Sequence, residues 1–133
     1  MEKGIVIVNE NLPVGLKANI CAVLGMSLGK KYPEVVGGDI FTLDRASISG
    51  ITQIPLPILQ GSSEKLSEIF EIHRNSDVFM AIFDNSALTT KNYSEFQNKI
   101  SCINLAELQI HGLIAYGPKK TINKISADLP LLK

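Results

Sequence analysis

The hydrophobic residues fall into short runs that alternate between the spacing of strands and the spacing of helices. Gly4–Val8 is continuous, apolar and rich in β-branched residues, which predicts a central strand. The next segment, Val14–Lys31, is almost wholly apolar and predicts a helix that ends before Pro33. Because such a helix must be covered on most sides, we expect it inside an α/β domain, with its polar entrance opening onto a hollow.

Later segments continue the alternation. Strands are predicted over Asp39–Asp44 and Ile51–Gln60, although Pro55 and Pro57 confine the second one to a sheet edge or an extended loop. The remaining segments predict a serine-capped helix, a central strand, a short helix, a strand and a last helix: Ser62–His73, Asp77–Asp84, Asn92–Ile103, Leu108–Tyr116 and Gly117–Asp128. This order predicts a three-layer α/β/α fold, a mixed sheet with helices on both faces.

Length and composition describe one domain. The chain has 133 residues, of which 45% are hydrophobic and 20% charged, so residues 1–133 form a single soluble domain with a core of its own. No apolar run approaches the ~18 to 20 residues of a membrane helix, and charged and polar residues come too early for a secretory signal. We therefore expect a cytoplasmic protein that does not contact membranes.

The cysteines and histidines do not predict a metal site. Cys21 lies in the apolar helix and is expected to pack as a small buried hydrophobe, unpaired with Cys102. His73 and His111 are far apart, and no Cys or His pair has the spacing of metal ligands. A capping or packing role is expected for His73, and no metal or cofactor is expected.

The net charge is zero, but the charges are uneven. Residues 1–33 carry four basic and two acidic side chains, residues 34–112 carry five and ten, and residues 113–133 carry four and one. If the first and last helices are neighbours, their lysines form one basic face. The alternative is that these are ordinary solvated lysines.

The first candidate site is the turn into the first helix. It has neither the glycine motif of a dinucleotide site nor a Walker lysine loop. Asn19, inside an apolar helix, must satisfy its amide or cost about 1–3 kcal/mol. Either Asn19 bonds to a neighbouring loop, or Lys17 and Asn19 face a ligand pocket at the carboxyl end of the first strand.

Two further candidates follow later strands. Lys119 and Lys120 lie in the first turn of the last helix, where they oppose the helix dipole unless an anion such as phosphate binds there. Exposed lysines are also common at such positions. Asp84, with the polar residues 85–90, follows a strand where open α/β sheets place ligands, although its simplest role is a turn or helix cap.

Three segments resemble a known family: residues 5–37 (IVIVNENLPVGLKANICAVLGMSLGKKYPEVVG), 50–60 (GITQIPLPILQ) and 115–132 (AYGPKKTINKISADLPLL). Over nearly its whole length the chain resembles an uncharacterised bacterial family, known only as a domain of unknown function, whose fold is like that of type II peptidyl-tRNA hydrolases. The resemblance implies a mixed four-stranded sheet between helical layers, often as a homodimer.

The catalytic motifs of those hydrolases are not matched. They carry a Gly-Lys-Gly-Lys turn before this helix and a Gln four residues after its Lys, where this chain has Val14–Lys17 and Cys21. Their Asp-Ala-Gly-(Arg or His)-Thr-Gln motif corresponds to Ile103–Gln109, which lacks both the acidic residue and the threonine at their places in the motif. Residues 117–132 match well, but that part of the family's pattern is largely structural.

These observations predict a protein that binds a small anionic or nucleotide-like ligand without the hydrolase's catalytic set, and they leave open whether it is an enzyme. The alternatives are an esterase acting on peptidyl- or aminoacyl-RNA with different residues, and a homodimeric protein-interaction module. Zero net charge and an aromatic content of 6% disfavour RNA as a partner.

Overall fold

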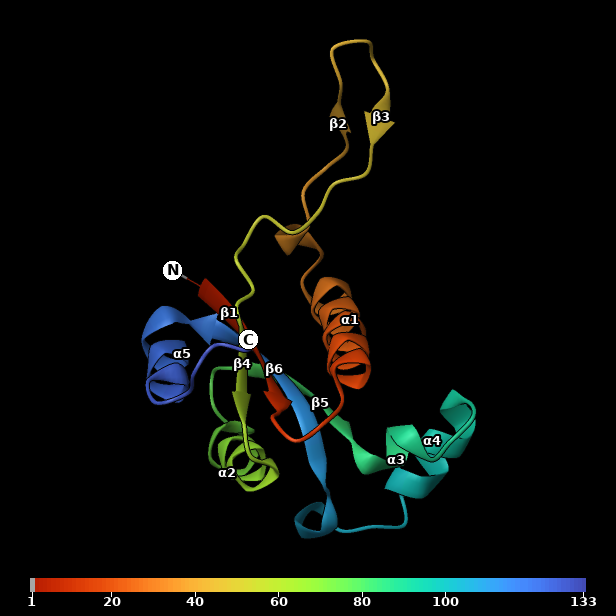
Figure 1. Cartoon of the computed structure of the whole chain (residues 1–133), viewed down its shortest axis with the longest axis vertical. Coiled ribbons are helices and arrows are strands. Elements are labelled where there is room, and N and C mark those ends of the chain that lie inside the picture. The colour runs from red at the N-terminus through yellow and green to blue at the C-terminus, as the bar shows by residue number, and fades with distance from the viewer. Residues whose placement is uncertain (1) are drawn as a thin grey trace.

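The computed structural model describes residues 2–133, which contain a four-stranded mixed sheet in the order β4–β1–β6–β5 (Figure 1). The strands are β1 (Glu2–Asn9), β4 (Ile58–Gly61), β5 (Phe79–Asp84) and β6 (Ile110–Pro118). β1 runs parallel to β4 and antiparallel to β6, which in turn pairs antiparallel with β5. The mixed sheet is therefore confirmed.

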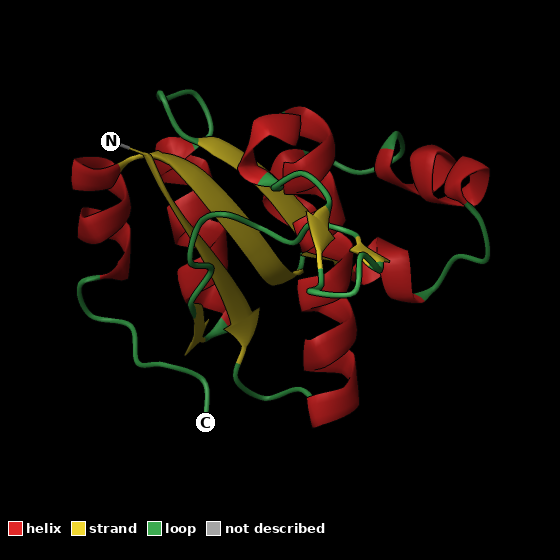
Figure 2. Ribbon diagram, turned by 90° about the horizontal axis from the view of Figure 1, so that it is seen from above, coloured by secondary structure: helices red, strands yellow, loops and turns green. Residues whose placement is uncertain are grey.

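Helices cover both faces of this sheet, as predicted (Figure 2). α1 (Val14–Lys31) lies on one face, and α2 (Ser63–His73) and α5 (Lys119–Ser126) lie on the other. Ser62 caps α2 as expected, because its hydroxyl accepts the backbone N–H of Lys65 at 3.1 Å. Two short helices, α3 (Asn85–Leu88) and α4 (Tyr93–Ile100), extend beyond the edge of β5.

β1 supplies both hydrophobic cores, because successive side chains of a strand point to opposite faces. Ile5 and Ile7 pack with α2 and α5, whereas Val6 and Val8 pack with α1. On the α1 face, Gly112 of β6 lets the helix approach closely, since a Cβ there would lie 2.3 Å from the Cγ2 of Ile20. The predicted central position of the first strand is correct.

α1 is less enclosed than the sequence suggests. Its buried side chains form one stripe, Ile20, Leu24 and Leu28. Val14 and Met26 are 80% and 78% exposed. The helix is an outer layer, so the expectation of a helix sandwiched inside the molecule is wrong, and its entrance opens to solvent.

The two edges of the sheet are treated differently. The proline-bearing segment does lead into an edge strand, β4, and the C-terminal tail covers that edge: Gln60 N–H donates to the carbonyl of Pro130, and Leu132 N–H to that of Ile58. β5 forms the other edge, with no further strand beside it among residues 2–133. The prediction that Asp77–Asp84 is a central strand is wrong. Among the described strands, β5 pairs only with β6, and β6 takes the central position beside β1.

Residues 36–52 form a two-stranded arm that projects away from the body (Figure 1). Its strands are β2 (Ile40–Phe41) and β3 (Ser47–Ile48). The strand predicted over Asp39–Asp44 is thus shorter and lies outside the main sheet, and only the end of the segment predicted over Ile51–Gln60 is a strand. A short 3₁₀ turn, η1 (Pro33–Val35), joins α1 to the arm. A second one, η2 (Leu105–Glu107), precedes β6.

No helix within residues 2–133 combines the length and the apolar character that crossing a bilayer requires.

Candidate functional site

A row of polar side chains lies at the end of the sheet where β1 and β5 finish and β6 begins. The amide nitrogen Nδ2 of Asn9 is 3.2 Å from Nδ1 of His111. On the other side of the ring, Nε2 of His111 is 3.4 Å from Oδ1 of Asn85. Asn9 is 7% exposed and His111 is half-buried. This relay connects three strand ends.

The hydrogen bonds define the tautomer of His111. Oδ1 of Asn9 accepts the backbone N–H of Asn11 at 3.1 Å, which turns the amide nitrogen toward the imidazole. Because that nitrogen donates, Nδ1 of His111 must accept, and the ring proton is on Nε2, where it donates to Asn85. The relay therefore holds the imidazole ring in one orientation.

The loop after Asn9 leads directly into α1, whose start is open. Pro13 precedes the helix, no side chain caps this end, and the first turn contains no acidic residue. The first helical bond is from Lys17 N–H to the carbonyl of Pro13, so the preceding N–H groups of the first turn point out of the helix. A Cβ on Gly15 would meet no atom within 4 Å, and the Lys17 side chain is half-buried.

Asp84 has a structural role at the same edge. It is 2% exposed, and its Oδ2 accepts the backbone N–H of Ser86 at 3.1 Å, which caps α3. The hydroxyls of Thr89 and Thr90 donate back to the carbonyl of Ser86. These residues build a turn and a cap, as the simpler interpretation held.

Three other predicted site residues, Asn19, Lys119 and Lys120, take no part in the hydrogen bonds of the relay. Asn19 is exposed, so its amide is solvated and the expected need for a protein partner is wrong. Lys119 and Lys120 follow Pro118, which pairs with Glu2 at the opposite end of β1. Lys17 and the lysine pair therefore cannot share one cleft.

The lysine pair lies beside a hollow of its own. Lys119, Pro55 and Pro57 line a space of about 440 Å³, so the proline segment does border a depression. Glu2 and Lys3 also line it. Its charged lining is thus Lys3 and Lys119 with one carboxylate, and Lys3 Nζ already donates to Oδ1 of Asn123.

The expected basic face does not form. α1 packs on one face of the sheet and α5 on the other (Figure 1). The sheet therefore separates the lysines of the two helices. The charge distribution along the chain thus corresponds to two separate basic regions.

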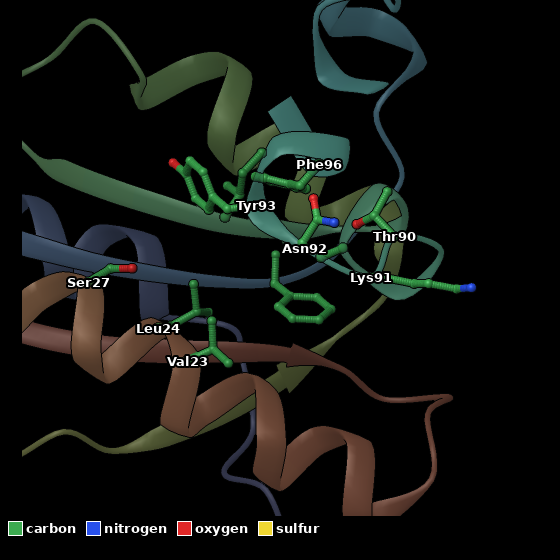
Figure 3. A pocket seen from close by; sticks show the side chains of 11 residues that line it. Val23, Leu24, Ser27, Thr90, Lys91, Asn92, Tyr93 and Phe96 are labelled. Carbon is green, nitrogen blue, oxygen red and sulfur yellow. The ribbon is translucent and has the colours of Figure 1, made fainter. Parts of the chain in front are cut away.

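An apolar groove runs between α1 and α4 (Figure 3). Val23, Leu24 and Ser27 line it from α1, and Tyr93 and Phe96 line it from α4. Its volume is about 440 Å³. Polar side chains, Ser27, Thr90, Lys91 and Asn92, line it beside the apolar ones, so the groove combines apolar contact with hydrogen-bonding groups.

Cysteine and metal chemistry have little support. Cys21 is half-buried and Cys102 exposed, and neither forms a disulfide. Burial raises the pKa of the Cys21 thiol, which makes it a poorer nucleophile at neutral pH. Within residues 2–133, no three His, Cys, Asp or Glu side chains converge in a way that would hold a metal ion.

Sequence reasoning did not identify His111 and Asn9 as partners. A signal was present in each case: Asn9 is the first polar residue after a buried strand, and His111 interrupts an apolar one. Their pairing depends on β6 lying beside β1, which the order of elements along the chain does not specify.

The fold and this edge define a three-layer α/β domain with a polar relay beside an open helix start. A family model described as "Protein of unknown function (DUF2000)" matches residues 2–133, and the chain belongs to this family. No curated protein sequence matches the chain. Among solved structures, the protein of unknown function Atu0240 from Agrobacterium tumefaciens strain C58 is similar, with a TM-score of 0.91 and 17% identity over 99% of this chain and 98% of that one. This similarity confirms the fold alone.

Proposed function

We propose that the protein binds a small anion, a phosphate- or carboxylate-bearing metabolite, at the start of α1. The observation that carries the proposal is the open first turn. It has outward N–H groups, no side-chain cap and no acidic residue, and Lys17 stands beside it. The N-terminus of a long helix favours negative charge, and a lysine in the same turn adds a charge-assisted bond.

The relay supports the same location. Asn9 shapes the turn into α1 through its contact with the Asn11 N–H, and it orients His111 through its other amide atom. A ligand at the start of α1 would thus lie at an edge where an imidazole and two amides are already fixed. Such groups give orientation and specificity to a bound metabolite.

We infer further that the fold is of the type II peptidyl-tRNA hydrolase kind, without that enzyme's catalytic set. The mixed four-stranded sheet and the resemblance of residues 5–37 and 115–132 support this inference. RNA is not favoured as the ligand, because the lysines of α1 and α5 lie on opposite faces of the sheet.

Titration calorimetry with pyrophosphate and with adenosine 5′-monophosphate tests the proposal. Lys17→Ala removes a bond to a charged group, worth about 1.5–3 kcal/mol, and is expected to weaken binding about 10- to 100-fold. Lys30→Ala, at the other end of the same helix, is the matched control and should bind like the wild type. Absence of heat with every anion, or equal losses in both variants, would contradict the proposal.

A second variant separates the site from general charge effects. Gly15→Glu places a carboxylate in the open space at the first turn. The helix dipole stabilises a carboxylate at this end, so the free energy of unfolding is expected to rise by about 0.3–1 kcal/mol. The same carboxylate repels an anion, so anion binding is expected to be lost. Urea unfolding and calorimetry on the same preparation measure the two effects.

A further inference from the structure

The arm, residues 36–52, exposes an apolar surface that no other part of residues 2–133 covers (Figure 1). Its exposed large apolar side chains are Val36, Ile40, Phe41, Leu43, Ile48 and Ile51. A two-stranded ribbon that stands alone is only marginally stable in water, and a concentration of exposed apolar residues marks a surface that contacts another molecule.

The arm nevertheless has a defined shape. At its tip the hydroxyl of Thr42 donates to Asp44 at 2.6 Å, and Arg45 takes a left-handed backbone conformation with φ of 74°. At its root a Cβ on Gly50 would lie only 2.0 Å from the carbonyl oxygen of Gly37. The two sides of the arm therefore approach each other at the root more closely than a side chain at position 50 would allow.

A surface of matching character lies on the body of the molecule. The groove between α1 and α4 is mostly apolar and reaches β5, whose Ile82 and Phe83 line it (Figure 3). β5 pairs with β6 on one side, and no strand of residues 2–133 lies on its outer side, whereas the C-terminal tail protects β4. On α1, Val23 in the wall of the groove and Met26 are both exposed.

The charges of the two surfaces are complementary. The arm carries two aspartates and one arginine: Asp39, Asp44 and Arg45. α1 carries three lysines and no acidic residue, and Lys91 lines the groove itself. The arm thus has a net charge of −1 and the groove side a net positive charge, so the two surfaces attract each other weakly.

The total surface points the same way. The chain exposes 8442 Å². A compact monomer of 14.5 kDa is expected to expose about 6,900 Å². The excess of about 1,500 Å² is larger than the about 800 Å² that each partner contributes to a stable interface. The protomer therefore exposes enough additional surface for an interface of that size.

We propose that two copies of this chain form a symmetric dimer by exchanging arms, each arm lying in the α1–α4 groove of the other copy. The arm projects away from its own body (Figure 1), and no arm residue lines the groove of the same copy. A two-fold axis near the arm roots gives two identical arm–groove contacts and closes the assembly, so no further copies add.

Sedimentation equilibrium of the full chain and of three variants tests this inference. The wild type should sediment at twice 14.5 kDa. Phe41→Asp on the arm and Val23→Asp in the groove each place a charge in an apolar contact and should weaken the dimer at least about 100-fold. Ile72→Asp is the matched control, because Ile72 is an exposed apolar residue of α2 that belongs to neither surface.

Mixing the variants distinguishes arm exchange from any other dimer. A Phe41→Asp chain keeps a sound groove and a Val23→Asp chain keeps a sound arm, so the mixture should form a heterodimer through one intact contact. A mixture of Phe41→Asp with Leu43→Asp, both arm variants, should stay monomeric. Circular dichroism verifies that each variant is folded.

Three results would overturn the proposal. One is a wild-type chain that remains monomeric at sub-millimolar concentration. The second is a dimer that neither Phe41→Asp nor Val23→Asp weakens relative to Ile72→Asp. The third is the failure of the two complementary variants to associate, which would mean that the arm is covered by something other than this groove.

Discussion

Asn9 connects two parts of the molecule through a single amide group. Its oxygen shapes the turn that leads into α1, and its nitrogen holds His111. Because the two atoms have different hydrogen-bonding roles, fixing one fixes the other, and with it the proton on the imidazole. The open first turn of α1 therefore stands beside a ring whose tautomer is already determined.

The tautomer is a prediction that NMR can measure. The ¹⁵N shifts of His111 at neutral pH should show an unprotonated Nδ1 and a protonated Nε2. Asn9→Ala removes the donor to Nδ1, so this variant should populate both tautomers. His73, which makes no such ring contact among the described hydrogen bonds, serves as the internal reference. A protonated Nδ1 in the wild type would contradict the relay.

At the scale of elements, the packing of α1 on the sheet depends on one glycine. Gly112 leaves the space that Ile20 fills, and a methyl group there would overlap the Cγ2 of Ile20. The helix can only accommodate it by moving outward, which disturbs the whole stripe of buried leucines beside Ile20.

Gly112→Ala is therefore expected to destabilise the fold by about 1–3 kcal/mol, measured by urea unfolding. Gly25→Ala is the matched control in α1: its new Cβ meets no atom within 4 Å, and replacing a helical glycine should stabilise by about 0.5–1 kcal/mol. Adding Ile20→Ala to Gly112→Ala should cost less than the sum of the two single changes, because the overlap is gone. An additive result would show that Ile20 is not the obstacle.

The sequence predicted those elements whose partners are local or whose pattern is strong. The first strand, the serine cap of α2 and the extent of α1 follow from residues close together in the chain. The position of β5 does not, because the intervening strand β6 comes from later in the chain. The start of α1 was identified as a candidate site, but the contact of Asn9 with His111 depends on that same strand order.

The arm shows another limit. The pattern of residues 39–44 predicted a strand, and that of residues 51–60 predicted an edge strand or an extended loop. In the protomer the apolar side chains in the arm, Ile40, Phe41, Leu43 and Ile51, are exposed instead, whereas Ile54, Leu56, Ile58 and Leu59 pack against the cores. Arm exchange would account for the pattern, since the burial that it indicates would take place against a second copy of the chain.

At the scale of the whole molecule, the two proposals occupy different regions. The anion site lies at the start of α1, at the carboxyl edge of β1. The arm surface is rooted beside η1, which follows the other end of the same helix. A variant that abolishes dimerisation, such as Phe41→Asp, is therefore expected to bind anions as the wild type does, and Lys17→Ala is expected to remain dimeric.

The most direct test of the central claim is an amide NMR titration of the ¹⁵N-labelled chain with pyrophosphate. If the start of α1 is the binding site, the largest shift changes will occur at Val14, Gly15 and Leu16, with the side chains of Asn9 and His111 also responding. Changes confined to Lys119 and Lys120 at the opposite end of the sheet, or no changes at saturating anion, would contradict the account.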